Sequence, residues 1–531
     1  MGTHATPVLI VGAGPVGAVL ALELAHHNVP CILVERSVRP SPHPKMDFVT
    51  GRSMELLRRL GLADVVRDRG VHPDHSMDFL WTRGFDEPPV MVWHRPSVNQ
   101  VRQRYLAVND GSSPAEPYQR VPGSLLEVIL RDAAREHPLI DLREGWTFSD
   151  LRQEPDGVTA TVIGPGSIGR QTVRARFLAG CDGSRSTVRR CLDIPVDTLG
   201  EPTQHSSVYF TSSDPELRRH GRAFVTIGPV GLTLVSRDEK AAWTASIPIP
   251  ADQPHTANPI SAIRERLGID FMVDNVISVA QWEGTLSVAT QYRAGSAFLV
   301  GDAAHQFYPT GGIGANAGIA DAVDLGWKLA ATVNGWGGPY LLTSYEMERR
   351  PAALVYRELG AGLLEVSRRF QRLTAAGASR EQLAGVLEQE YHHVDNLGAQ
   401  FGTRYTQSPV VWPEQGSAPS WYWDRINPTT WPGCRVPSVR LAGGDQVLDL
   451  LGGDLSLVDL SGRGIGETLV KEARQRGIPM NHVPLGEPAV RSCWERDLVL
   501  VRPDQHVAWR DDEAPHNWDD VLDRVTGHRT T

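Results

Sequence analysis

The chain has 531 residues, more than one hydrophobic core usually organises, so two or three domains are expected. Hydrophobic residues make up 41% and charged residues 22%, the composition of a globular protein. The net charge of −9 speaks against a nucleic-acid partner, because phosphate contacts need a surplus of lysine and arginine. The five cysteines form no CxxC pair, which predicts no disulfide framework, no metal site and a cytoplasmic location.

The uncharged stretch from Pro7 to Leu22 superficially resembles a signal peptide or a membrane anchor. Several glycines interrupt it, no basic region precedes it, and Glu23 ends it short of the roughly 20 apolar residues that a span needs. We interpret it as a buried strand that leads into a helix, and we expect no membrane association.

A dinucleotide-binding motif lies within this stretch. Residues 8–11 are typical of a buried parallel strand, residues 18–25 of a helix and residues 31–34 of the next strand, which ends at Glu35. Between strand and helix stands Gly12-Ala-Gly14-Pro15-Val16-Gly17. The first glycine permits a tight turn, the second lets backbone amides approach a pyrophosphate, and the third lets the helix pack closely. Glu35 stands where a carboxylate would accept hydrogen bonds from a ribose.

Residues 164–169 also match the glycine pattern and provide a control. The segments on either side, 157–163 and 170–178, both read as strands, and no helix follows. This copy therefore predicts a hairpin turn without a nucleotide.

Two further strands end in polar loops. Residues 177–181 lead into Asp182-Gly183, and residues 297–300 lead into Gly301-Asp302. We call each strand end with its polar loop a corner. A glycine-rich loop follows the second of these corners, and a helix is expected over 319–332. Both corners should lie at the carboxyl edge of the same sheet as Gly12, where such sheets bind ligands. Loop amides before a helix can stabilise negative charge on a reduced flavin.

These three motifs, in this order and spacing, resemble the group A flavoprotein aromatic hydroxylases over residues 7–395. The resemblance implies tightly but non-covalently bound FAD, NAD(P)H as a transient co-substrate, and O₂. It also implies hydroxylation of a small phenol-like or polyketide ring through a flavin C4a-hydroperoxide. We find no second dinucleotide fingerprint, so NAD(P)H is expected to bind transiently on the FAD domain.

The resemblance also assigns roles to residues. Glu35 would hold the adenosine ribose, Asp302 the ribityl chain, and Pro309 would lie beside the reactive flavin face. Lys45, Arg52 and Pro309 are the positions expected to serve catalysis. The full set expected to bind the cofactor is Gly12, Gly14, Pro15, Val16, Gly17, Glu35, Arg36, Lys45, Arg52, Arg120, Asp182, Gly183, Gly301, Asp302, Pro309, Gly312, Gly314, Ala315 and Asn316.

Strands without intervening helices are expected at 207–211, 223–227, 232–236 and 242–249. They predict an antiparallel sheet that roofs the flavin, with residues 75–120 completing this lid. Candidate substrate contacts are Tyr209, Arg222, Phe224 and Trp243, although alternating aromatics also fit an ordinary half-buried strand. No general base is evident, and His305 is interpreted as a structural histidine that satisfies loop carbonyls.

Two long helices follow. The first is expected over 343–369, opened by a capping box of Thr343 and Glu346 and kinked near Pro351, and the second over 380–391. Their apolar faces fit either core packing or a contact in a homo-oligomer. Residues 408–439 read as a linker. The strands 455–460 and 497–502 and the helix 466–475 then resemble a thioredoxin-like domain without CxxC, which points to a packing role.

The predicted fold is α/β: a Rossmann-like FAD domain in two parts (1–195 and 282–395), a substrate sheet (196–281) and a C-terminal unit (408–531). Three alternatives stay open: a flavin dehydrogenase or reductase, a halogenase, and a flavin-binding protein without turnover. A halogenase would need a WxWxIP motif, which residues 243–248 match only in part. The substrate, the choice of NADH or NADPH, the oligomeric state and the role of the C-terminal domain remain open.

Overall fold

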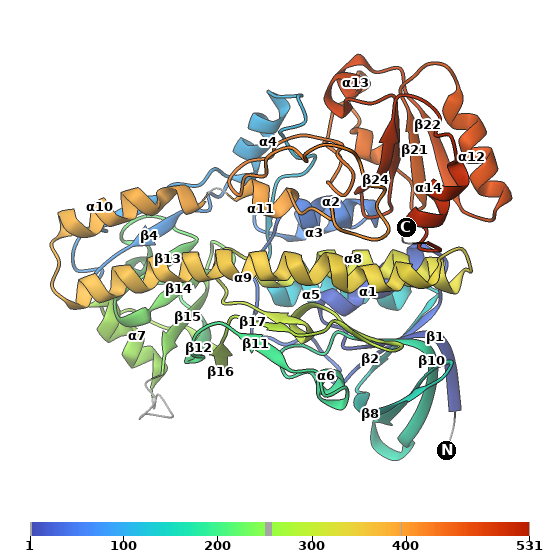
Figure 1. The fold of residues 1–531 in the computed structure, drawn as a ribbon. Coiled ribbons are helices and arrows are strands. Elements are labelled where there is room, and N and C mark those ends of the chain that lie inside the picture. The colour runs from blue at the N-terminus through green and yellow to red at the C-terminus, as the bar shows by residue number, and fades with distance from the viewer. Residues whose placement is uncertain (1–2, 250–257, 395, 530–531) are drawn as a thin grey trace.

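The computed structural model describes residues 3–249, 258–394 and 396–529. The long helix α9 (Pro339–Ala375) crosses the molecule and connects an eight-stranded sheet with a seven-stranded sheet, and the C-terminal domain covers one end of α8 (Ile313–Val333) (Figure 1). No helix in the described ranges is long and apolar enough to cross a membrane. All five cysteines carry free thiols.

The eight-stranded sheet forms the base of the molecule. Its central strand β1 (Thr3–Val11) lies between β10 (Gly169–Gly180) and β2 (Cys31–Glu35), all parallel, and β10 pairs with β19 (Ala297–Leu299). Val8, Leu9 and Ile10 are fully buried, as expected for a strand covered on both faces. The remaining strands are β7 (Ile140–Glu144), β8 (Thr147–Glu154), β9 (Gly157–Gly164) and β18 (Arg293–Ala294).

Residues 170–178 and 177–181, which were predicted as two strands, form the single strand β10. Residues 169–175 of β10 pair antiparallel with β9 on one edge, and residues 172–180 pair parallel with β1 on the other edge. The second glycine motif is the turn between β9 and β10, as predicted, with a short 3₁₀ segment over Gly166–Ile168. The same strand therefore serves both a surface hairpin and the buried sheet.

Helices α1 (Pro15–His26), α5 (Gly123–Glu136) and α8 cover this sheet. Helix α8 begins at Ile313, six residues before the predicted start, because the left-handed Gly312 (φ 65°) ends the loop at once. Gly314, Asn316 and Gly318 thus belong to the first helical turns rather than to a loop. At Gly318 an added Cβ would lie 2.6 Å from Val16, so the glycine lets α8 approach the first glycine loop.

The seven-stranded sheet forms the lid. The predicted strands all exist, and residues 75–120 contribute β4 and β5, but the β13–β4 pair is parallel, so the sheet is mixed. In order across the sheet its strands are β16 (Asn275–Gly284), β12 (Thr203–Thr211), β15 (Ala242–Pro248), β14 (Thr233–Ser236), β13 (Val225–Ile227), β4 (Phe79–Trp81) and β5 (Met91–Trp93). Helix α7 (Pro259–Leu267) packs on the face turned away from the base.

Smaller elements connect the base and the lid. A two-stranded sheet joins β3 to β6, and a three-stranded sheet has the order β11-β17-β20. These strands are β3 (Phe48–Val49), β6 (Gln119–Arg120), β11 (Val196–Thr198), β17 (Ser287–Ala289) and β20 (His305–Gln306). The short helices are α2 (Gly51–Arg59), α3 (Ala63–Arg69), α4 (Val98–Leu106), α6 (Thr187–Cys191) and α11 (Leu397–Phe401).

Helix α9 starts at Pro339, not at the predicted capping box at Thr343, because proline is well suited to the first helical position. Pro351 lies inside the continuous helix. Glu346, expected in that capping box, instead accepts hydrogen bonds from the backbone amides of Tyr292 (2.8 Å) and Arg293 (3.3 Å). The second helix is confirmed as α10 (Arg380–Glu390).

The C-terminal domain is a four-stranded sheet in the order β22-β21-β23-β24 with helices on it. Residues 408–439 do not form the predicted linker but pack into this domain, since Val410, Val436 and Val439 are fully buried in its cores. The elements are β21 (Leu455–Asp459), α12 (Ile465–Gln475), β22 (Met480–Pro484), α13 (Pro488–Trp494), β23 (Leu498–Val501), β24 (Val507–Asp511) and α14 (Trp518–Val525). Of these, β22, α13 and α14 were not predicted.

Candidate functional site

The three polar corners lie side by side. Strands β1, β10 and β19 are neighbours, with Val11 opposite Gly180 and Gly180 opposite Leu299, so their carboxyl ends fall in line. An added Cβ on Gly12 would lie 2.5 Å from the Cys181 carbonyl oxygen, which shows how closely two of the corners touch. The structure therefore brings together the motifs at residues 12, 182 and 302.

The three glycines of the first motif have different surroundings. Gly12 has a φ of 101°, and a Cβ on Gly17 would lie 1.9 Å from the Gly12 carbonyl oxygen, so neither position has room for a side chain. A Cβ on Gly14 would meet nothing within 4 Å. Backbone packing thus requires the first and third glycines, while the second borders open space, where a pyrophosphate could lie.

Two carboxylates order the loops around this space. Glu35 accepts hydrogen bonds from the backbone amides of Ala13 (2.8 Å) and Ser37 (2.9 Å), which ties the end of β2 to the first glycine loop. Asp182 accepts from the Ser186 hydroxyl (2.6 Å) and from the amide of Thr187 (2.6 Å), at the start of α6. The loop that contains Gly183 is therefore fixed by its own aspartate.

Asp302 differs from these two acids. It lies in the 3₁₀ turn Gly301–Ala303, its side chain is exposed, and no hydrogen bond to it is formed within the described residues. The carboxylate is therefore available to a ligand that offers hydroxyl groups.

His305 is structural, as predicted, although its partner is a carboxylate and not a loop carbonyl. Its Nε2 lies 2.7 Å from Asp321 Oδ2 and the residue is buried. Asp321 also accepts from Arg349 Nε (2.7 Å) and from the Gly301 amide (3.2 Å). Burial alone would raise the pKa of Asp321, but Arg349 and His305 outweigh it and lower that pKa. The cluster holds the Gly301 corner against α8.

The glycine-rich corner is locked by Asn316 and Phe48. Asn316 accepts from the Thr50 amide (2.9 Å) and donates to the Gly312 carbonyl (2.7 Å), which ties α8 to β3 and to the loop. A Cβ on Gly312 would lie 2.3 Å from the Phe48 ring. Pro309 is exposed at the start of this loop. Gly314 and Ala315 lie half-buried in the first turn of α8.

The predicted basic residues do not converge. The three polar corners at residues 12–17, 182–183 and 301–302 together form the predicted FAD cradle. Arg36 and Lys45 are exposed near this cradle. Arg52 instead points to the C-terminal domain, where its guanidinium donates to the Asp504 carbonyl (2.7 Å) and to the Gln505 side chain (2.5 Å). Burial, with repulsion from Arg435, lowers the pKa of Arg52 to about 10.

Arg120 is held by the lid and not by the cradle. Its guanidinium donates to the carbonyls of Ser76 (3.1 Å) and Ser236 (2.9 Å) and pairs with Glu239 at 2.6 Å. It also lies 4.4 Å from the centre of the Phe224 ring. Arg52 and Arg120 are therefore held by different domains, Arg52 by the C-terminal domain and Arg120 by the lid, and their contact with the cofactor stays a prediction.

The four candidate substrate contacts lie on different surfaces. Tyr209 pairs with Thr244 on the lid face toward the base, close to His43 (6.4 Å between rings), and Phe224 contacts Phe48 (6.4 Å). Trp243 pairs with Phe210 on the opposite face, packed in the core under α7. Arg222 is exposed and donates to the Glu239 carbonyl. Trp243 is thus corrected to a core residue, because strand neighbours point to opposite faces.

Sequence reasoning missed two residues on the face toward the base. His43 lies between the hydroxyls of Ser207 (3.1 Å) and Ser278 (2.9 Å), and burial lowers its pKa to about 4. Arg237 is buried, donates to the Thr244 hydroxyl (2.9 Å) and pairs with Asp47, and burial lowers its pKa to about 9. Neither residue lies in a predicted strand, so no local sequence pattern singled it out.

We expect Trp243→Phe to lower the free energy of unfolding by about 1–3 kcal/mol, the usual cost of removing buried volume. Substrate affinity should stay unchanged, because the indole lies on the far face of the lid. Chemical denaturation and KM measure the two effects. A raised KM with unchanged stability would instead indicate that Trp243 contacts the substrate.

Comparison with known proteins supports the assignment of the three corners to an FAD-binding domain. A family model described as an FAD binding domain matches residues 5–356, and one described as the C-terminal part of aromatic-ring hydroxylases matches residues 429–528. An FAD-dependent monooxygenase of Emericella nidulans, apdD, is 34% identical, covering 96% of this chain and 88% of that protein. Tetracenomycin B2 monooxygenase-dioxygenase of Streptomyces olivaceus is 32% identical, covering 98% and 97%.

Among solved structures, RebC with bound 7-carboxy-K252c aligns with a TM-score of 0.87 and 30% identity, covering 99% of this chain and 100% of that one. Both domains of the chain are therefore accounted for by one group of proteins, and FAD is the cofactor. The chain belongs to the FAD-dependent aromatic-ring hydroxylases, a family of flavoprotein monooxygenases.

Proposed function

We propose that this monooxygenase uses NAD(P)H and O₂ to hydroxylate an electron-rich, phenol-like or polyketide-type ring. The observation that carries the proposal is the meeting of three glycine-bearing strand ends at one sheet edge. The family model over residues 429–528 is described as aromatic-ring hydroxylase, which supports a ring substrate here, and similar proteins are named for tetracenomycin B2 or bind 7-carboxy-K252c.

The residues at this edge fit FAD. Open space beside Gly14 and Gly183 leaves room for a pyrophosphate, and Glu35 stands at the end of β2, within reach of a ribose. The unbonded carboxylate of Asp302 would accept from ribityl hydroxyls, and the Gly312 corner would face the ring system with Pro309 beside it. When bound, FAD would supply the redox chemistry: two electrons from NAD(P)H reduce O₂, one oxygen atom enters the ring as a hydroxyl group, and the other leaves as water.

The lid would hold the aromatic substrate against this corner. Phe48 and Phe224 offer flat apolar surfaces, while Tyr209, Thr244 and His43 offer hydrogen-bonding groups on the same face. With its pKa near 4, His43 is neutral at physiological pH, and its two ring nitrogens bond the hydroxyls of Ser207 and Ser278, so it orders this face without adding charge. Closing the lid on the base excludes water, which protects the reactive oxygen species from unproductive decay.

Asp302→Ala should weaken FAD binding by about 10- to 100-fold, since hydrogen bonds to a charged group contribute about 1.5–3 kcal/mol. FAD titration of the deflavinated protein, followed by flavin fluorescence, measures this change. Asp156→Ala, in the exposed turn between β8 and β9, is the control and should bind FAD like the parent. Equal affinities in the two variants would remove Asp302 from the cofactor site.

The function itself is tested by incubating the purified holoprotein with NAD(P)H, ¹⁸O₂ and a panel of phenols and polycyclic quinols. We expect NAD(P)H oxidation coupled to oxygen uptake, with one ¹⁸O atom in the product ring. Ring oxidation without ¹⁸O would indicate a dehydrogenase, and a product that requires halide would indicate a halogenase. No turnover with any reductant would leave a flavin-binding protein.

A further inference from the structure

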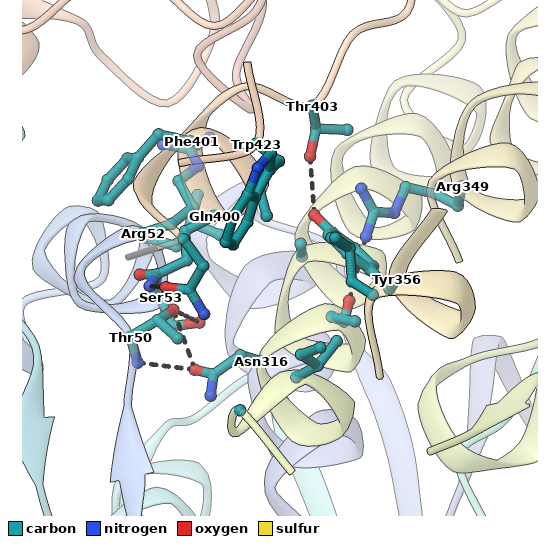
Figure 2. Close-up of a pocket in the computed structure, with 18 of the residues that line it drawn as sticks. Thr50, Arg52, Ser53, Asn316, Arg349, Tyr356, Gln400, Phe401, Thr403 and Trp423 are labelled. Carbon is teal, nitrogen blue, oxygen red and sulfur yellow. Dashed lines mark hydrogen bonds between the residues drawn. The ribbon is translucent and has the colours of Figure 1, made fainter. Parts of the chain in front are cut away.

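A pocket lies where the two parts of the FAD domain meet the C-terminal domain, next to the Gly312 corner, and Arg52 and Asn316 of the predicted cofactor set are among its lining residues. Its empty volume is about 900 Å³, counting the part that opens to solvent. Figure 2 shows Phe401 and Trp423 on one side, Tyr356 and Arg349 on the other, and Thr50 and Asn316 at the base. The predicted binding of FAD gives this space no function.

The pocket lies on the opposite side of α8 from the first glycine loop. Asn316, Ala320 and Val323 line it. At about 100° per residue, Gly318 points the other way, and a Cβ there would meet Val16 and the Gly301 backbone. The pocket and the nucleotide loops are therefore separated by the thickness of a helix.

The charged groups around the pocket are neutralised by protein partners. Arg349 is bonded to Asp321, to the Tyr405 hydroxyl (2.9 Å) and to the Ala317 carbonyl (3.2 Å). Asp504 pairs with Arg502 at 2.7 Å. Arg52, the third charged group of the lining, pairs with Glu55 at 3.2 Å. The other lining side chains are aromatic, aliphatic or neutral polar, such as the hydroxyl of Tyr356, which lies 2.8 Å from that of Thr403. Such a surface favours an uncharged, flat ligand.

One polar group in the wall lacks a partner. His506 lines the pocket, is 5% exposed, and its Nε2 has no hydrogen bond within the part of the chain that the structure describes. Its Nδ1 lies 3.1 Å from the Asp504 carbonyl and 3.3 Å from the Asp504 carboxylate. Two acceptors beside Nδ1 place the ring proton there, so Nε2 is left as an acceptor. A buried acceptor without a donor is costly, and a ligand hydroxyl would satisfy it.

The C-terminal domain builds this wall with a constrained turn. The turn Arg502–His506 connects β23 to β24 and is buried between α2, α8 and α9. Gln505 within it has a φ of 64°, a left-handed conformation that a non-glycine residue keeps only where its surroundings impose it. Arg52 holds the turn by its bonds to Asp504 and Gln505. The pocket is therefore incomplete without the C-terminal domain.

We propose that this interdomain pocket is a second binding site, for an uncharged planar aromatic molecule that carries a hydroxyl group, with His506 as its hydrogen-bond acceptor. Thr50 and Asn316 form its base and also hold the Gly312 corner. A ligand in the pocket thus touches the residues that shape the predicted flavin site, and its binding should alter the flavin absorbance spectrum of the holoenzyme.

The probe is 2-naphthol, titrated calorimetrically into the holoenzyme, with 2-methoxynaphthalene as the analogue that lacks a donor. Ala320→Phe fills the pocket and should lower the number of naphthol molecules bound by one per chain. Ala375→Phe, at the exposed end of α9, is the matched control and should bind like the parent. His506→Phe should weaken naphthol about tenfold, the worth of one hydrogen bond, and leave 2-methoxynaphthalene unchanged.

The position is checked by the bromine signal of 6-bromo-2-naphthol in crystals of the holoenzyme, expected between α8 and Trp423. A bromine only against the lid sheet, or identical binding by Ala320→Phe and the parent, would overturn the proposal. Flavin content and melting temperature of each variant show that it is folded. Because binding is measured without turnover, failure here would leave the proposed hydroxylation untouched, and absent hydroxylation would leave this site testable.

Discussion

Gly12→Ala is expected to yield protein with less than about a tenth of the parent's bound FAD. The backbone at residue 12 has a φ of 101°, where an L side chain costs about 1–3 kcal/mol. The new Cβ would also lie 2.5 Å from the carbonyl oxygen and 2.8 Å from the carbonyl carbon of Cys181. These are backbone atoms at the end of the neighbouring strand, so they cannot rotate away, and the β1 and β10 corners would have to separate.

The flavin-to-protein absorbance ratio of the purified variant measures this loss, with circular dichroism to verify the fold. Gly166→Ala is the matched control from the second glycine motif, since its φ is also positive (57°) and a Cβ there would meet nothing within 4 Å. We expect it to keep its FAD. A Gly12→Ala protein that is as yellow as the parent would contradict the cofactor site at this corner.

Arg502→Met is expected to lower the free energy of unfolding by about 3–5 kcal/mol, the usual cost of breaking a buried ion pair. The Arg502 side chain is fully buried and pairs with Glu348 (2.7 Å), Asp324 (3.0 Å) and Asp504 (2.7 Å). Without it, three buried carboxylates share Lys328 as the remaining cation of the cluster, which bonds to Asp324 (2.8 Å) and Glu348 (2.5 Å). The loss should loosen the C-terminal domain from α8 and α9.

The pH dependence of this variant has a definite sign. In the parent, burial disfavours the charged form of Glu348, but Arg502 and Lys328 hold its pKa well below the usual range, so its contribution is constant from pH 5 to 8. Without Arg502 the carboxyl pKa values should rise above their unfolded values. A raised folded pKa contributes stability at low pH that is lost as the pH rises. The variant should therefore be more stable at pH 5 than at pH 8.

Urea denaturation at both pH values tests this expectation. Arg491→Met is the control, because the Arg491 side chain is 40% exposed and pairs with the partly exposed acids Asp497 and Asp512. Such a surface pair is worth about 0–1 kcal/mol. If the two variants lose equal stability, the buried cluster does not hold the domains together.

The cofactor corners were predictable from the sequence because each is a local pattern. An apolar strand, a glycine turn and a helix follow one another within about 20 residues, the span of a βα unit, so Gly12, Gly14 and Gly17 could be told from the look-alike at 164–169. The order of the corners followed from the parallel strands that carry them. The start of α8 was misplaced, since the left-handed Gly312 stops the loop without any local sequence signal.

The partners of single side chains depended on the tertiary structure. Arg52 binds the turn at Asp504, 452 residues away, and no spacing in the sequence announces that contact. Trp243 is aromatic on a predicted strand, but only the register of β12 against β15 decides which face it occupies. The second pocket likewise arises from segments of three distant regions. The sequence by itself determined where glycine and acidic corners stand, because backbone geometry is encoded locally, whereas long-range packing chose the face and the partner of each side chain.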